Sequence, residues 1–85
     1  MKICDYKGRK NICGIRVHET CRNAKLTQIE LAAQLQCNGI VIERDSISRI
    51  ELGTRFVADY ELCEIAKILN VSISYLLDTD TAHKA

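Results

Sequence analysis

The chain has 85 residues, of which 47% are hydrophobic and 27% charged, with four glycines and no proline. This length permits one domain with a modest core, and it excludes an enzyme that encloses a deep pocket on a large sheet. The formal net charge of +1 excludes a generally basic nucleic-acid-binding protein, so any electrostatic surface for such a partner has to be local. We expect a single domain over residues 1–85, with its core at about 12–78 and short tails at both ends.

No apolar run approaches the roughly 18 residues that span a bilayer, and the N-terminal stretch lacks the apolar core of a signal peptide. We therefore expect a cytoplasmic protein with no membrane partner. The five cysteines are odd in number, and none is paired at CxxC spacing. Cys13, Cys21 and Cys63 fall where helices need small apolar residues, which favours buried thiols over a metal or redox site. Cys4 and Cys37 are expected to be the exposed ones.

Two helices are predicted in the first half of the chain. In residues 11–25 the apolar residues on one helical face recur at spacings of three and four: Cys13, Val17, Cys21 and Ala24. Asn11 can cap the start of this helix. The stretch LTQIELAAQL then begins with a capping box, in which Thr27 and Glu30 satisfy each other's backbone amides. It predicts a second helix.

Three more helices are predicted downstream. Ile47 and Ile50 form the inner pair of one helix, and Gly53 suits the left-handed residue just past its end. The stretch that begins near Asp59 gives the clearest amphipathic pattern, with apolar residues at i, i+3, i+4 and i+7: Leu62, Ile65, Ala66 and Leu69. Ser72 can cap a short last helix, ISYLLD. The chain is therefore expected to be all-α, with five helices.

The connection between the second and third helices, CNGIVIERDSIS, is longer than the three or four residues of an ordinary helix-turn-helix. Asn38 and Gly39 are suited to ending a helix, and Ile40 and Ile42 share a face if the segment is extended. We therefore expect a lengthened turn at residues 38–43, whose isoleucines pack between the two helices. A second helix that runs one turn longer is the alternative, and Gly39 disfavours it.

The blocks LTQIELAAQL, ISRIELG and ELCEIAKILNVSISYLL, in this order, resemble the lambda-repressor-like (Xre/Cro-type) helix-turn-helix family. The resemblance covers about residues 12–78. It implies a compact five-helix domain that binds double-stranded DNA without a cofactor or metal and lays its third helix in the major groove. In the family roughly eleven positions separate the leucine of ELA from the isoleucine of ISR, whereas Leu31 and Ile47 are 16 apart. The excess falls in the lengthened turn.

The resemblance also assigns DNA contacts. With Ile47 and Ile50 pointing inward, the outer face of the third helix carries the residues expected to read bases: Arg44, Asp45, Ser48 and Arg49. An arginine can bond the O6 and N7 of guanine together. The residues expected to contact phosphate, the last two more weakly than the others, are Gln28, Thr54, Arg55, Arg16 and Lys25. Asp45 can instead cap the third helix, because Glu43 is a poor cap.

Two positions depart from the family pattern. Many family members pair an arginine with the glutamate found here as Glu51, and this chain has Cys21 in place of the arginine. We expect Arg22 or Arg16 to replace it, since an unpaired buried carboxylate is costly. Leu52 is apolar where the family is polar, so it is expected to be either an added packing contact or an exposed side chain.

The inventory of side chains argues against an enzyme. His18 and His83 belong to no nucleophile or metal constellation, and a surface histidine is the better interpretation of His18. We expect a sequence-specific transcriptional regulator with no small-molecule ligand. A repressor is favoured over an activator because occupancy alone blocks a promoter. The alternative is an antitoxin or protein-interaction module on the same helices, which the outward basic residues of the third helix disfavour.

A weak homodimer is expected, at least on DNA. One domain of this size buries roughly 600–1,000 Å² on DNA, which is too little for tight specific binding. Two copies on half-sites about one helical turn apart would supply the rest. The last helix is expected to offer the apolar surface for this contact: Ile73, Tyr75, Leu76 and Leu77.

Overall fold

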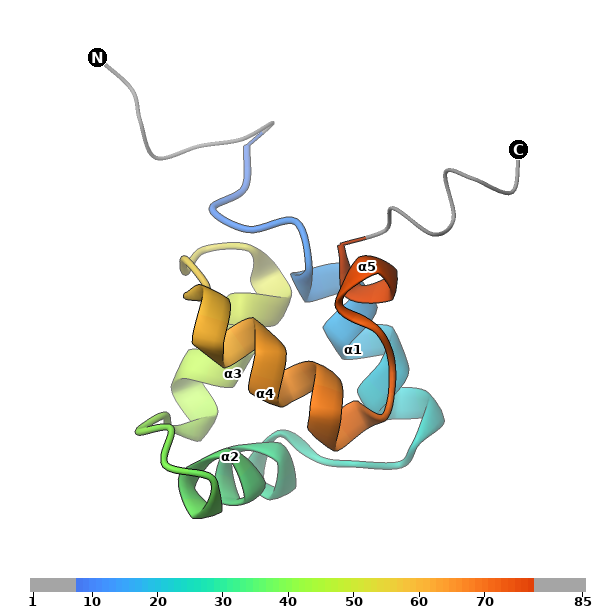
Figure 1. Ribbon diagram of the computed structural model, residues 1–85. Coiled ribbons are helices and arrows are strands. Elements are labelled where there is room, and N and C mark those ends of the chain that lie inside the picture. The colour runs from blue at the N-terminus through green and yellow to red at the C-terminus, as the bar shows by residue number, and fades with distance from the viewer. Residues whose placement is uncertain (1–7, 78–85) are drawn as a thin grey trace.

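The computed structural model describes residues 8–77, which form five helices around one core (Figure 1). The helices are α1 (Gly14–Asn23), α2 (Gln28–Cys37), α3 (Arg44–Leu52), α4 (Asp59–Leu69) and α5 (Ile73–Leu76). The expected all-α domain of five helices is therefore confirmed. Both expected tails lie mostly outside the described residues. No helix within residues 8–77 is long and apolar enough to cross a bilayer.

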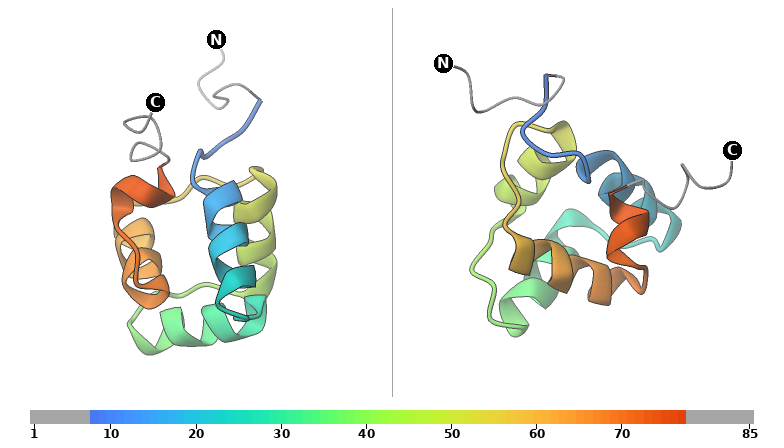
Figure 2. Two further views of the ribbon diagram at one scale, coloured as in Figure 1. Left: turned by 90° about the vertical axis from the view of Figure 1, so that its right-hand side faces the viewer. Right: turned by 45° about the horizontal axis from the view of Figure 1, so that its top comes forward.

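The core is built where the helices meet. In Figure 1 and in the left view of Figure 2, α2 runs across one end of the domain, and it packs against both α3 and α4. The third helix also packs along α1. Side chains from all five helices are fully buried: Val17, Leu31, Leu35, Ile47, Ile50, Ile65 and Leu76. The predicted inner pair of α3 is thus confirmed, and α3 is fixed by contacts on two sides.

Caps at the helix ends follow the sequence in most places. Thr27 Oγ1 accepts a hydrogen bond from the Glu30 amide at 3.1 Å, and Glu30 Oε1 accepts one from the Thr27 amide at 2.8 Å, so the predicted capping box is confirmed. Gly53 ends α3 with a φ of 83°, and Ser72 Oγ accepts from the Tyr75 amide at 3.0 Å. These contacts satisfy backbone groups that a helix end leaves without partners.

The start of α3 differs from expectation. Neither Glu43, at the N-cap, nor Asp45 accepts a hydrogen bond from a backbone amide of the first turn. The Asp45 carboxylate instead accepts one from the Arg44 guanidinium at 3.0 Å. Capping by Asp45 is therefore wrong, because in the first turn its side chain points outward to its neighbour rather than back along the helix.

Residues 38–43 connect α2 to α3. α2 ends at Cys37, and Gly39 has a φ of 89°, so α2 does not continue through the segment. Ile40 and Ile42 are buried, as predicted, and Val41 between them is 95% exposed. This alternation is that of an extended chain lying on the core. That the connection is longer than in related domains stays a prediction.

Residues 9–11, which we call the strap, precede α1 and cover the C-terminal end of α3. The N-cap residue of α1 is Cys13, but Asn11 Oδ1 accepts from the Gly14 amide at 2.9 Å and so satisfies the first amide of the helix. Asn11 Nδ2 donates to the carbonyls of Ile50 and Arg55, at 3.0 and 2.8 Å. Arg9 donates to the carbonyl of Glu51 at 3.1 Å. The strap thus supplies donors to two carbonyls at the end of α3, where a helix leaves carbonyls unpaired, and to one carbonyl in the loop that follows.

The cysteines differ in burial, and we expect them to differ in reactivity. Cys13 and Cys21 are buried as predicted, whereas Cys63 is only half-buried and Cys37 is exposed. Burial raises the pKa of Cys13. The pKa of Cys21 is raised to about 11, mainly by burial and to a smaller extent by the negative charge of the nearby Glu51 carboxylate. Cys4 lies outside the described residues.

We expect a maleimide at pH 8 to label Cys37 first and Cys21 only when the chain unfolds. At that pH a pKa of about 11 lowers the thiolate fraction roughly 200-fold below that of a thiol with a pKa of about 8.5, before access is considered. Mass-spectrometric mapping of labelled peptides against time measures this. Labelling of Cys21 as fast as that of Cys37 would contradict the burial of Cys21.

Candidate nucleic-acid interface

The outward face of α3 carries the four residues predicted to read bases. Arg44, Asp45 and Arg49 are exposed and Ser48 is half-buried, on the side opposite the buried Ile47 and Ile50. These positions share one face because they are spaced by three and four residues on a helix. The Arg49 guanidinium makes no hydrogen bond or ion pair within residues 8–77, so it can bond an incoming partner without first breaking a contact.

Arg44 is held at the first turn of α3. Its NH2 donates to Asp45 at 3.0 Å, and its NH1 lies 3.4 Å from the Oε1 of Gln28 at the start of α2. The structure therefore brings together Arg44, predicted to read bases, and Gln28, predicted to contact phosphate. Both side chains of the ion pair with Asp45 are more than half exposed, so this pair adds little to stability.

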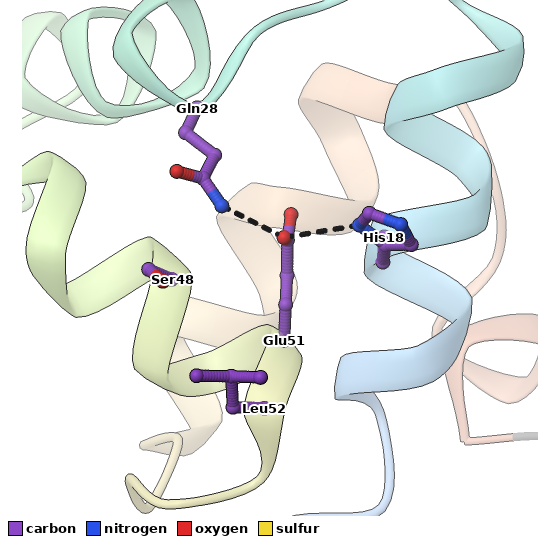
Figure 3. Close-up of a pocket in the computed structure, with 5 residues that line it drawn as sticks. All are labelled: His18, Gln28, Ser48, Glu51 and Leu52. Atoms are coloured by element: carbon purple, nitrogen blue, oxygen red, sulfur yellow. Dashed lines mark hydrogen bonds and ion pairs between the residues drawn. The ribbon is translucent and has the colours of Figure 1, made fainter.

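Glu51 has partners that the sequence did not indicate. Its Oε1 accepts from Gln28 Nε2 at 2.9 Å and lies 3.1 Å from His18 Nδ1 of α1 (Figure 3). The expectation that Arg22 or Arg16 would pair with this carboxylate is therefore wrong. His18 is the functional candidate that sequence reasoning missed, because its partner lies 33 residues away on another helix.

An open pocket of about 230 Å³ surrounds this cluster, between α1, α2 and α3. It is lined by His18, Gln28, Ser48, Glu51 and Leu52. The sequence left open whether Leu52 is an added packing contact or an exposed side chain. It is 67% exposed, so it is an exposed side chain. It is not a core contact.

The loop after α3 contains the other predicted phosphate contacts, Thr54 and Arg55. Thr54 is exposed, and its backbone amide donates to the Arg49 carbonyl at 2.9 Å. The Arg55 guanidinium, in contrast, forms two hydrogen bonds to the buried Glu61 carboxylate, at 2.9 and 3.0 Å. These bonds hold the pKa of Glu61 below its ordinary value. Arg55 is therefore committed to a partner within the chain.

The two weaker candidates lie outside α3 and the loop that follows it. The guanidinium of Arg16 stacks 4.5 Å from the ring centroid of Tyr75, on the side of α1 that meets α5. Lys25 is exposed in the connection between α1 and α2, with a φ of 56°.

Comparison with solved structures identifies the fold. The chain matches the P22 c2 repressor protein, solved in complex with a synthetic operator in the presence of Tl⁺, with a TM-score of 0.66. The match covers 79% of this chain and 94% of that chain, at 24% sequence identity. This chain has a lambda-repressor-like fold. No protein-family model and no curated protein matches the sequence.

The P22 c2 repressor likeness confirms the expected arrangement of five helices. At 24% identity it shows the fold alone, and the bound operator belongs to that repressor. The contacts of individual residues with DNA are therefore proposals, which depend on the chemistry of the outward face of α3.

Proposed function

We propose that this chain is a sequence-specific regulator that binds double-stranded DNA with α3 in the major groove, and that it acts as a repressor. The observation that carries the proposal is the outward face of α3. There the Arg49 guanidinium has no hydrogen bond or ion pair within residues 8–77, and it lies on the same face as Ser48 and as Arg44, which contacts Gln28 and Asp45. Guanidinium groups on one exposed helix face suit the acceptor pattern of guanine in the major groove. The local placement of these charges accounts for specific binding by a chain whose net charge is only +1.

The proposed backbone contacts surround this helix. Gln28 is the first residue of α2, where free backbone amides favour an anion such as phosphate. Thr54 presents a hydroxyl in the loop that follows α3. Lys25 adds a charge near the start of α2. These contacts would set the orientation of α3 without reading sequence.

We expect Arg49→Ala to weaken binding to the preferred site by about 1–3 kcal/mol and to flatten the preference at one base pair, because a bidentate arginine–guanine pair is lost. Lys25→Ala is the matched control, since it also removes one positive charge. Lys25→Ala should change the affinity for the preferred duplex and for random duplexes by the same factor, whether or not that factor differs from one. The preferred site is first selected from a random-sequence library by the wild-type chain, and affinities are then measured by gel shift at several salt concentrations. Equal losses for Arg49→Ala on every sequence would contradict a base-reading role.

We further propose a weak homodimer on DNA, but the last helix is a poorer surface for it than the sequence indicated. Leu76 is fully buried in its own core, and Tyr75 and Leu77 are partly buried against that core, with Arg16 over the Tyr75 ring. Of the four residues, Ile73 is the exposed one. Footprinting should show two protected half-sites about one helical turn apart. A single protected half-site, with a monomer in equilibrium sedimentation at high concentration, would contradict the dimer.

A protein-interaction function of the antitoxin type is the second candidate. It is favoured by exposed apolar side chains between the end of α3 and the first turn of α4: Leu52, Phe56 and Tyr60. Exposed aromatic residues are frequent in protein interfaces. The selection experiment separates the two functions, because a wild-type chain that enriches no duplex from the library favours the protein partner.

A further inference from the structure

The Glu51 carboxylate is the junction of a polar network that crosses three helices. Its side chain is only 9% exposed, and one oxygen, Oε1, contacts both the Gln28 amide and the His18 ring. Figure 3 shows the two side chains reaching Glu51 from α2 and α1. Because a carboxylate only accepts hydrogen bonds, the Nδ1 of His18 has to carry a hydrogen in this arrangement.

The same contact fixes the orientation of the Gln28 amide. An amide has one donating end and one accepting end, and Glu51 can be satisfied only by the donating Nε2. The accepting Oε1 of Gln28 then faces the Arg44 guanidinium, whose NH1 lies 3.4 Å away. Asp45 accepts from the other terminal nitrogen of Arg44, at 3.0 Å. The guanidinium is thereby held between two acceptors before any partner arrives.

We propose that His18 is a positioning residue for DNA binding, acting through Glu51 and Gln28 on the guanidinium of Arg44. This inference rests on the proposed function. A long arginine side chain loses rotamer freedom when it binds, and holding it beforehand reduces that loss. His18 supplies a donor and, when protonated, a charge to a carboxylate that would otherwise be free to turn away from Gln28.

A purely structural role for His18 predicts a different result. Arg44 is 53% exposed at its side chain, and no hydrogen bond or ion pair joins it directly to His18. If the network only stabilised the fold, removal of His18 would change unfolding but would affect DNA binding independently of Arg44. A positioning role makes the two residues energetically coupled in binding, although they are not in contact.

The test is a double-mutant cycle on the duplex that the wild-type chain selects from a random library. His18→Ala should weaken binding about threefold to tenfold in the wild-type background. In the Arg44→Ala background the same change should have less than about a twofold effect, because the group it positions is gone. Asn23→Ala, another exposed position on α1, is the control and should leave affinity unchanged.

His18→Asn keeps a hydrogen-bond donor at this position and removes the imidazole ring, so it shows whether the donor alone is sufficient. The asparagine amide nitrogen can occupy about the same place as Nδ1, so this variant should bind within about twofold of wild type. In the free protein, the side-chain amide resonances of Gln28 should shift in His18→Ala and should stay near their wild-type positions in His18→Asn. Urea unfolding of each variant establishes that it is folded at the temperature of the binding measurement.

The outcomes are distinct. Additive losses in the cycle, or unchanged Gln28 resonances in His18→Ala, would overturn the positioning role while leaving DNA binding intact. A wild-type chain that selects no duplex would overturn the proposed function and this role together. Coupled losses, with recovery in His18→Asn, would support both.

Discussion

Gly14→Ala is expected to lower the free energy of unfolding by about 3 kcal/mol, because α1 crosses the end of α3 at this residue without room for a side chain. A Cβ at Gly14 would overlap the backbone carbonyl oxygen of Ile50, and it would lie 2.7 Å from the Arg9 guanidinium and 2.9 Å from Asn11 Oδ1. A backbone oxygen cannot rotate away as a side chain can. The two helices would have to move apart, and the hydrogen bonds of the strap would be broken.

Intrinsic helix propensity acts in the opposite direction. Alanine is favoured over glycine within a helix by about 1 kcal/mol, so an open site would gain stability from this change. Overpacking costs about 1–3 kcal/mol where side chains can adjust, and more where the backbone has to move. We therefore expect the overlap at Gly14 to dominate.

Gly39→Ala is the matched control for Gly14→Ala. Nothing lies within 4 Å of an added Cβ at Gly39, but its φ of 89° disfavours alanine. It should cost about 1–2 kcal/mol through backbone strain alone. Urea denaturation of both variants measures the difference, and a Gly14→Ala chain as stable as Gly39→Ala would contradict the close crossing of α1 and α3.

Arg55→Ala is expected to lower the free energy of unfolding by about 3 kcal/mol at neutral pH, because it leaves the Glu61 carboxylate without its counter-charge. The Glu61 side chain is 8% exposed, and both its oxygens accept from Arg55. We place the loss at the lower end of the range for broken buried pairs for two reasons. Arg55 is 27% exposed, and the Ala58 amide still donates to Glu61 at 3.0 Å. Arg55→Lys keeps the charge but not the paired geometry, so its loss should be smaller.

The pH dependence of this pair has a definite sign. Hydrogen bonding from Arg55 lowers the pKa of Glu61 in the folded chain, so the pair's contribution is present above the unfolded value of about 4.3. It is lost as the pH falls through the lower folded pKa. The stability difference between wild type and Arg55→Ala should therefore narrow on acidification from pH 7 to about pH 3, and it should also shrink in a Glu61→Gln background. A difference that is constant across this pH range would contradict the pairing.

These stability effects also bear on the DNA contact predicted for Arg55. That contact stays a prediction, and Arg55→Ala tests it only where the variant is shown to be folded. Weaker binding by a partly unfolded chain would otherwise imitate the loss of a phosphate contact.

Local features of the chain were predictable because their partners lie within a few residues. The capping box of Thr27 and Glu30, the left-handed Gly53 and the buried pair Ile47 and Ile50 depend on spacing along one helix. Helical periodicity of three and four residues places such groups together whatever the rest of the fold does. The same periodicity predicted the outward face of α3, although its contacts with DNA remain proposals.

The sequence by itself determined which residues form helices and which side of each helix is apolar. Only the tertiary structure decided which polar groups from different elements meet. His18 and Glu51 are 33 positions apart, Asn11 and Arg55 are 44 apart, and the crossing of Gly14 over Ile50 joins two helices that are not consecutive. The physical reason is that periodicity reports burial along one element, whereas ion pairs and close backbone approaches depend on how separate elements are placed. No local pattern encodes that placement.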